Sequence, residues 1–455
     1  MPEPRLHFVG IGGVGMSALA QAARDRGRAV SGSDRLFDRE GGNETFAKLR
    51  AQGVTLMPQD GTGPGGDCGA VIVSSAVEAD NPDRRAAEAR GIPVMHRAAL
   101  LAEWVAGHAQ WAVAGTCGKT TITGLLGWLL AAGGQDPLVL NGGEVCAWSG
   151  PGRFGSTRPG SGPAVFEADE SDRSLLRFEP EWALISNISA DHFALEESRR
   201  LFAEFTRRVR CGLILGSGVR AALGALPPRL EIVALEEHAL GDAANCLTWE
   251  GETYAVPLPG RHNLENAALA VAAARRAGVA PPVIRTALAE FTGLRRRLEL
   301  VGGTGRVFDD YAHNPAKISA AWRALAERAP AVIGVWRPHG FAPLANWADE
   351  LTAGLRQALR PGAHFLILPV YYAGGSATRT LTAADYAARL AAEGLPVECV
   401  PDYERACERV RALAQPNTRV LCCGARDPDL PALARALDQA LAGCGTGKSA
   451  LQPAG

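Results

Sequence analysis

Residues 111–130 read WAVAGTCGKTTITGLLGWLL, a short apolar strand, a glycine-rich loop and a long apolar helix in direct succession. The run before the loop has the length of a buried strand, and the run after it has the length of a helix. Glycine stands where the chain must turn sharply between them, because glycine adopts positive φ without a steric penalty. Other parts of the chain repeat this strand–loop–helix unit, which predicts an α/β fold with mainly parallel sheets.

The loop GTCGKTT carries groups that suit the phosphates of a nucleotide. Backbone amides of such a loop cradle phosphates, a lysine neutralises their charge, and the hydroxyl after the lysine can hold Mg²⁺. The strict P-loop spacing fails, because Val113 occupies the position of its first glycine. The Gly-Lys-Thr core between a strand and a helix still predicts an ATP site. Its expected residues are Gly115, Thr116, Gly118, Lys119, Thr120 and Thr121.

Upstream lies a second glycine-rich turn, GIGGVGMS (residues 10–17), which also follows a strand and opens a helix. Such a turn lets a phosphate approach the free N–H groups of a helix N-terminus. Asp34 ends the next strand about 20 residues further on, where an acid meets a ribose in a dinucleotide fold. The pattern predicts a second nucleotide site. Two nucleotide sites are better explained by ATP together with a nucleotide-linked substrate than by a single dinucleotide cofactor.

Downstream, two further apolar strands end in polar and charged residues. The first, in AVFEADESDRS (residues 164–174), delivers Glu167, and the second, in WALISNISADH (residues 182–192), delivers His192. Ligands gather at the carboxyl ends of parallel strands, so Glu167 and His192 are predicted to hold Mg²⁺ for phosphoryl transfer. The acids Glu170 and Asp172 could equally be helix caps or solvated loop residues.

The alternation of strands and helices separates three blocks, and a chain of 455 residues is long enough for several cores. The Gly/Pro-rich stretch at 149–163 is expected to be a surface loop. The third block contains four strand-to-loop transitions, in GRVFDDYAHNP, APAVIGVWRPH, HFLILPVYYAG and NTRVLCCGA. The predicted domains are residues 1–107, 108–295 and 296–442, followed by a polar tail, 443–455, that is expected to be disordered.

The composition excludes several classes of function. With a formal net charge of −1, the chain has no field for nucleic acid or an anionic membrane surface. It contains no apolar run long enough to span a bilayer and no signal-peptide pattern. Its ten cysteines include no C-x-x-C pair, so they indicate reduced thiols rather than a disulfide framework or a zinc site. These features predict a cytoplasmic protein.

Seven segments together resemble the Mur ligases of peptidoglycan synthesis, and the resemblance covers essentially the whole chain. In order they are HFVGIGGVGMS, SGSD, GTCGKTT, EADESD, NISADH, GRHNLENA and DDYAHNP. The likeness is greatest to the branch that adds L-alanine to the carboxylate of UDP-N-acetylmuramate. It implies an N-terminal Rossmann-like domain for the UDP-sugar, a central P-loop-type ATPase domain and a C-terminal Rossmann-like domain. It also implies ATP and Mg²⁺ as cofactors, and a monomer or homodimer.

The resemblance implies roles for individual residues. Lys119 should hold the β- and γ-phosphates of ATP, Thr120 should ligate Mg²⁺ with Glu167 and His192, and Arg297 should reach the γ-phosphate. Lys119, Glu167, His192 and Arg297 are therefore the expected catalytic residues. The expected contacts to adenine and ribose are Asn263, Asn266 and Asp310. The residues expected at the UDP-sugar are Gly12, Gly13, Gly15, Ser33, Asp34 and Ser74, and those at the acceptor are His313 and His339.

The sequence also departs from the alanine-adding branch. Cys117 replaces a histidine in the phosphate loop, and His192 is followed by FALEES. In RPHGFAP (residues 337–343), Gly340 stands where that branch has an arginine. An arginine there could clamp a carboxylate bidentately, whereas glycine cannot. The acceptor site is therefore the part least transferable from the family.

Three alternatives remain open at this point. A related ligase could use another amino acid, a peptide or another nucleotide sugar, as the altered RPHGFAP segment suggests. A nicotinamide-dependent oxidoreductase would explain GIGGVG and Asp34 but not GKTT or EADESD. A UDP-sugar sensor without activity is disfavoured by the intact Lys119, Glu167 and Arg297. The sequence leaves open the acceptor, the exact nucleotide sugar and the oligomeric state.

Overall fold

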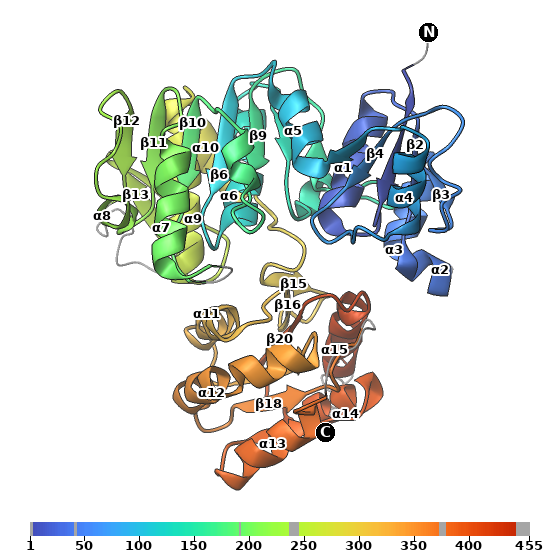
Figure 1. Cartoon of the computed structure of the whole chain (residues 1–455). Helices are drawn as coiled ribbons and strands as arrows, with labels where there is room; N and C mark the ends of the chain where they lie inside the picture. The colour runs from blue at the N-terminus through green and yellow to red at the C-terminus, as the bar shows by residue number, and fades with distance from the viewer. Residues whose placement is uncertain (1–2, 41–42, 191–192, 236–244, 373–378, 443–455) are drawn as a thin grey trace, which may run out of the picture. The chain divides into compact units, whose positions relative to one another are not determined.

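The computed structural model describes residues 3–40, 43–190, 193–235, 245–372 and 379–442. The chain divides into two compact units, each described here by itself. Unit 1 comprises Met1–Pro257 and His262–Leu294, and unit 2 comprises Leu258–Arg261 and Arg295–Gly455. Three mainly parallel sheets with connecting helices confirm the α/β prediction (Figure 1). The predicted tail at 443–455 lies outside the described residues.

The first sheet of unit 1 has five parallel strands in the order β3-β2-β1-β4-β5. This order reverses direction between β1 and β4, and ligands of such sheets bind outside the carboxyl ends of the strands at that point. The strands are β1 (Arg5–Val9), β2 (Val30–Ser33), β3 (Thr55–Met57), β4 (Cys68–Val73) and β5 (Val94–His96). The helices are α1 (Val14–Asp25), α2 (Arg35–Glu40), α3 (Glu44–Ala51), α4 (Pro82–Ala89) and α5 (Arg97–Val105).

The second sheet of unit 1 has seven strands in the order β12-β11-β10-β6-β9-β7-β8, and only β8 runs antiparallel to its neighbour. The strands are β6 (Gln110–Ala114), β7 (Leu138–Leu140), β8 (Thr157–Arg158), β9 (Ala164–Glu167), β10 (Trp182–Ile185), β11 (Gly212–Leu215) and β12 (Glu231–Ala234). The α-helices are α6 (Lys119–Ala132), α7 (Leu195–Thr206), α8 (Val219–Leu223), α9 (Arg261–Arg276) and α10 (Pro281–Ala289). The hairpin β13 (Cys246–Trp249) and β14 (Glu252–Ala255) stands apart, and two short 3-10 helices are η1 (Cys146–Trp148) and η2 (Ser174–Arg177).

Unit 2 has a six-stranded sheet in the order β15-β16-β20-β17-β18-β19, in which only β15 is antiparallel. The four strand-to-loop transitions expected in the third block are confirmed as β16, β17, β18 and β20. The strands are β15 (Glu299–Val301), β16 (Val307–Asp310), β17 (Val332–Arg337), β18 (His364–Ile367), β19 (Val397–Cys399) and β20 (Arg419–Gly424). The helices are α11 (Pro315–Ala326), α12 (Phe341–Ala358), α13 (Ala383–Ala392), α14 (Tyr403–Leu413) and α15 (Leu430–Ala442).

Among the described residues, none of the helices is both long and apolar enough to cross a membrane. The domain borders expected at 107–108 and 295–296 stay predictions.

The stretch at 149–163 is not simply a surface loop, and that prediction is wrong in part. Phe154, Ser156 and Thr157 are buried, and Thr157 begins β8. Gln21, which is wholly buried on α1, accepts a hydrogen bond from the Phe154 amide (2.7 Å) and donates one to the Phe154 carbonyl (2.8 Å). Glycine and proline shape the turns of this stretch, but partners distant in sequence bury its centre.

Replacing Gln21 by alanine should therefore destabilise unit 1. The variant leaves a buried amide and a buried carbonyl of Phe154 without their partner, and each unsatisfied group costs about 1–3 kcal/mol. We expect the apparent melting temperature, followed by circular dichroism, to fall by several degrees. Gln357→Ala, at an exposed site on α12, is the matched control and should melt like the wild type. Equal melting of both variants would contradict the assigned role of Gln21.

Candidate active site

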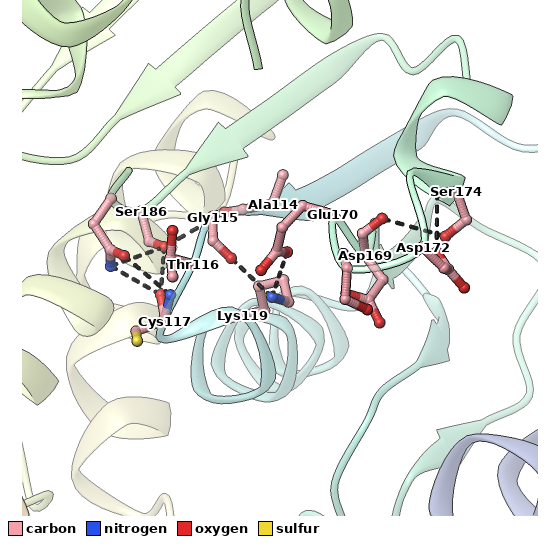
Figure 2. Close-up of polar contacts among 12 residues, drawn as sticks. Ala114, Gly115, Thr116, Cys117, Lys119, Asp169, Glu170, Asp172, Ser174 and Ser186 are labelled. Carbon is pink, nitrogen blue, oxygen red and sulfur yellow. Dashed lines mark hydrogen bonds and ion pairs between the residues drawn. The ribbon is translucent and has the colours of Figure 1, made fainter. Parts of the chain in front are cut away.

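The loop between β6 and α6 is built around two glycines with left-handed backbone. Gly115 has φ 126° and Gly118 has φ 91°, values that L side chains rarely adopt. A Cβ atom on Gly115 would collide with the Ser186 hydroxyl, and one on Gly118 would collide with the Asn266 side chain. The neighbouring strand β10 and helix α9 therefore press directly on the loop. This confirms the tight strand-to-helix turn expected for a phosphate loop (Figure 2).

Asn187, just beyond β10, holds the same loop through its backbone. Its side-chain oxygen accepts a hydrogen bond from the Cys117 amide (3.0 Å), and its side-chain amide donates to the Cys117 carbonyl (2.9 Å). Its own carbonyl accepts from the Thr116 amide (3.1 Å), and the Thr116 hydroxyl accepts from the Ser189 amide (3.0 Å). These bonds from Asn187 reach the backbone of Cys117, so they do not require a particular side chain at this position.

Lys119 lies at the start of α6 with its ammonium group enclosed by oxygen atoms. Its Nζ donates to the Gly115 carbonyl (2.8 Å) and forms an ion pair with Glu170 Oε2 (2.6 Å); the two side chains are 14% and 5% exposed. Burial lowers the pKa of Lys119, but the attraction of Glu170, Asp169 and Glu167 outweighs it, and the net pKa is raised. Lys119 is thus a cation at neutral pH. Figure 2 shows Glu170 pointing toward it.

Glu170 is therefore neither a helix cap nor a solvated loop residue. Nothing in the sequence indicated that Glu170 pairs with Lys119, apart from the place of Glu170 in EADESD.

Thr120 and Glu167, two of the predicted Mg²⁺ ligands, border the same pair of glycines after β7. Glu167 Oε1 accepts a hydrogen bond from the Gly142 amide (2.7 Å), and a Cβ on Gly143 would stand 2.7 Å from Thr120 Cγ2. A carboxylate and a hydroxyl are oxygen ligands of the type that Mg²⁺ prefers. His192, the third predicted ligand, lies outside the described residues. Among the residues that are described, no group of three or more His, Cys, Asp or Glu side chains could hold a metal ion.

The two asparagines of α9, Asn263 and Asn266, are both buried. Asn266 Nδ2 donates to Asn263 Oδ1 (3.3 Å), and Asn266 packs against Gly118. The structure thus brings both residues to the phosphate loop, and their contact with adenine stays a prediction. Thr121, which follows Thr120 on α6, is likewise buried.

A cavity of about 580 Å³ opens at the carboxyl edge of the first sheet. Gly13, Gly15, Asp34 and Ser74 line it, as expected for a site that holds a nucleotide. Asp34 accepts hydrogen bonds from the Gly12 amide (2.9 Å) and the Leu36 amide (2.8 Å), so its carboxylate also shapes the glycine-rich turn.

Ser33 does not line this cavity, and its contact with substrate stays a prediction. Its side chain is wholly buried and donates to Asp83 Oδ2, which also accepts a hydrogen bond from His7 Nε2 (3.2 Å). Ser33 belongs to the buried network that supports the end of β2.

Sequence reasoning missed Arg97 on the wall of the same cavity. Its guanidinium lies 3.3 Å from Asp169 Oδ2 and 3.4 Å from Asp172 Oδ2, and a Cβ on Gly15 would stand 3.1 Å from its Nη1. Ser171 and Asp172 line the cavity too. The segment 169–172 therefore faces the cavity through Asp172 and faces the phosphate loop through Glu170.

In unit 2, the predicted residues gather around the carboxyl end of β16. Asp310 accepts hydrogen bonds from the amides of Leu298 and Ala312 (2.7 Å each), and burial raises its pKa although Arg297 opposes the shift. The Arg297 guanidinium lies over the Tyr311 ring, 5.6 Å from its centroid. Asp310 therefore holds the turn that carries Arg297.

The histidines predicted at the acceptor lie together in unit 2. The rings of His313 and His339 are 5.1 Å apart and meet edge to face. The Trp347 ring is 5.7 Å from that of His339.

A phosphate loop with a buried lysine, oxygen side chains beside it and a glycine-lined cavity on the neighbouring sheet define an α/β nucleotide-binding enzyme of the phosphoryl-transfer class. Comparison with known proteins narrows the class. Residues 5–109 match the family described as "Mur ligase family, catalytic domain", and residues 296–426 match "Mur ligase, glutamate ligase domain". The chain belongs to the Mur ligase family.

Sequences of known relatives align with this chain over nearly its whole length. A UDP-N-acetylmuramate–L-alanine ligase of Rhizobium meliloti is 32% identical, with 92% of this chain and 93% of the relative covered. One of Kineococcus radiotolerans is 35% identical, with 93% of each chain covered. The crystal structure of a UDP-N-acetylmuramate–alanine ligase from Thermotoga maritima superposes with a TM-score of 0.77 at 24% identity, covering 97% of this chain and 100% of that one. The last likeness bears on the fold, which it confirms.

Asn187→Ala should impair nucleotide binding while the protein stays folded. It removes two side-chain hydrogen bonds to Cys117, so the loop amides lose part of their preorganised arrangement. We expect the KM for ATP to rise about tenfold, measured by coupled ADP release. Asn187→Asp keeps the acceptor for the Cys117 amide and should fall between the wild type and Asn187→Ala. An unchanged KM in Asn187→Ala would show that the loop does not depend on this clamp.

Proposed function

We propose that this protein joins L-alanine to the carboxylate of UDP-N-acetylmuramate with consumption of ATP, a step in the synthesis of the peptidoglycan precursor. Its relatives named UDP-N-acetylmuramate–L-alanine ligase align over nearly their whole length. The observation that carries the proposal is the segment 169–172. It contacts the phosphate loop through Glu170 and Lys119, and it contacts the glycine-lined cavity through Asp172 and Arg97.

This arrangement suits a reaction in which a carboxylate must meet the terminal phosphate of ATP. A carboxylate is a poor electrophile at neutral pH, and transfer of the γ-phosphoryl group converts it to an acyl phosphate. The amine of the acceptor then attacks the carbonyl carbon, the C–N bond forms, and inorganic phosphate leaves. The protein's own contribution is to position the reactants and to offset negative charge.

The phosphate loop supplies that charge compensation. Lys119 would hold the β- and γ-phosphates, with amides of Gly115, Gly118 and Thr121 around them, while Thr116 would border them in the same loop. Glu170 is the counter-ion of Lys119. The family resemblance supports two further sets of contacts. Asn263, Asn266 and Asp310 would contact the adenine and ribose, and Arg297 would contact the γ-phosphate.

Mg²⁺ would be held by Thr120 and Glu167, with His192 as the third protein ligand. Glu167 and Thr120 border Gly142 and Gly143, and their carboxylate and hydroxyl groups are oxygen ligands of the type that fits this ion. When bound, the ion would offset the charge of the phosphates and so reduce their repulsion of the incoming carboxylate.

The cavity on the first sheet would take the UDP moiety, with its diphosphate at Gly13 and Gly15. A diphosphate there would meet the N-terminus of α1 and its free amides. Asp34 and Ser74 complete the site on the side of β2 and β4, and Gly12 would contribute by holding the Asp34 carboxylate through its amide. His313 and His339 would face the acceptor. We place the reaction in the cytoplasm, where ATP is available.

A second candidate is a Mur-type ligase with another acceptor or nucleotide sugar. Gly340 favours it, because the loop after β17 lacks the arginine of the alanine-adding branch. A murein peptide ligase of Psychrobacter arcticus has a similar fold, with a TM-score of 0.67 at 21% identity.

Phosphate release separates the two candidates. With ATP, Mg²⁺ and UDP-N-acetylmuramate, we expect release to require an amino acid and to be fastest with L-alanine. The assay omits and adds each amino acid in turn, and then the peptide L-Ala-γ-D-Glu-meso-diaminopimelate. Release with another acceptor alone would replace L-alanine in the proposal, and no release with any acceptor would overturn the ligase assignment for this nucleotide sugar.

Lys119→Ala should lower kcat at least about a hundredfold, the size of effect seen when a single charge-stabilising donor is removed. UDP binding, measured by calorimetry, should stay nearly unchanged, because the cavity on the first sheet does not include Lys119. The same titration serves as the control for folding, since the variant leaves the buried Glu170 without its counter-ion. Loss of UDP binding in a variant of normal melting temperature would contradict the separate placement of the two nucleotides.

A further inference from the structure

Three loops meet at the carboxyl edge of the sheet in unit 2. They follow β16, β17 and β20, and two of them carry His313 and His339. The loop after β17 continues into Gly340, which offers no side chain. The question is therefore which described group could receive the carboxylate of an amino acid at this edge.

The loops after β17 and β20 are fastened to each other. Arg337 donates from Nη1 to Asp427 Oδ2 (2.6 Å) and to the Tyr403 hydroxyl (2.7 Å), and Tyr403 in turn donates to Asp427. A Cβ on Gly424 would stand 2.8 Å from the Arg337 carbonyl, so the backbones are also close. Arg337 and Asp427 thus bring the residues beside them, His339 and Arg426, to the same place.

Arg426 has an unusual backbone. Its φ is 66°, in the left-handed region that glycine occupies without penalty and that costs other residues on the order of 1 kcal/mol. The side chain is exposed, and within the described ranges no hydrogen bond or ion pair holds its guanidinium. Arg426 thus occupies a backbone conformation that suits glycine, and no carboxylate among the described residues pairs with its guanidinium. Both features favour a role of this side chain in binding.

Besides Arg426, the cation Lys317 also acts on His339. Burial, followed by the positive charges of Arg426 and Lys317, lowers the pKa of His339 to about 4. His339 is therefore neutral at physiological pH, and its Nδ1 is buried with no hydrogen-bond partner among the described atoms. The charges of two cations thus act on a neutral imidazole whose ring lies beside the His313 and Trp347 rings.

We propose that Arg426 binds the α-carboxylate of the acceptor, assisted by Lys317, and that it takes the place of the arginine that Gly340 lacks. The inference rests on the proposed ligase function and specifies its acceptor as an amine that carries a free carboxylate. A guanidinium can bind such a carboxylate through two parallel hydrogen bonds.

The test compares L-alanine with L-alaninamide, which lacks the charge. In Arg426→Gln the KM for L-alanine should rise about ten- to a hundredfold, while the KM values for ATP and UDP-N-acetylmuramate stay unchanged. The KM for L-alaninamide should not rise, so the preference of the wild type for the carboxylate should disappear. Arg426→Lys should recover part of the affinity.

Two further variants exclude a loss of folding. Arg426→Gly relieves the left-handed strain, so it should melt no lower than the wild type and still bind L-alanine weakly. Arg435→Gln, at an exposed arginine of α15, should behave like the wild type. An unchanged KM for L-alanine in both Arg426→Gln and Arg426→Gly would overturn the inference.

Hydroxylamine separates this outcome from failure of the ligase proposal itself. It attacks an acyl phosphate without needing a carboxylate site, so wild type and Arg426→Gln should form the hydroxamate of UDP-N-acetylmuramate at equal rates. Absence of hydroxamate in the wild type would overturn the proposed function and the inference with it. Equal hydroxamate formation together with an unchanged KM for L-alanine would overturn the inference alone.

Discussion

The buried ion pair between Lys119 and Glu170 connects the parts of unit 1 on which the proposed chemistry depends. An ammonium group withdrawn from water is unfavourable by several kcal/mol unless an opposite charge and hydrogen bonds accompany it. Glu170 and the Gly115 carbonyl supply both. The loop after β6 and the segment after β9 must therefore keep their relative positions for the lysine to remain charged where a nucleotide phosphate would bind.

The same segment after β9 gives the two sites of unit 1 a common wall. Glu170 turns toward the phosphate loop, whereas Asp169 and Asp172 meet Arg97 beside the glycine-lined cavity. A ligand phosphate at either place would compete with these carboxylates for a cation. Binding at one proposed site would thus change the charge balance of the segment that also borders the other.

In unit 2, polar contacts hold the loops at one edge of the sheet in a defined arrangement. Asp310 holds the turn of Arg297 by accepting two backbone hydrogen bonds, and the Arg337–Asp427 pair fastens the loops after β17 and β20. These carboxylates act on neighbouring backbone and side chains within the unit. They keep nearby side chains, including His339 and Arg426, in defined positions from which a ligand could be bound.

The sequence by itself determined the strand–loop–helix units, because apolar periodicity and glycine placement are local properties. It also predicted that Gly115, Gly118, Lys119 and Asp34 belong to two glycine-rich strand-to-helix turns, since each turn is encoded by a short stretch of sequence. The short strands β3, β5, β15 and β19 escaped notice, because three residues carry too little pattern.

Only the tertiary structure paired Glu170 with Lys119, buried Ser33, placed Phe154 in the core and brought Arg426 to His339. Each of these contacts joins distant segments, from Ser33 and Asp83, which are 50 positions apart, to Gln21 and Phe154, which are 133 positions apart. The sequence separation of two residues does not indicate whether they are in contact, because the order of strands within a sheet decides which loops lie at the same edge.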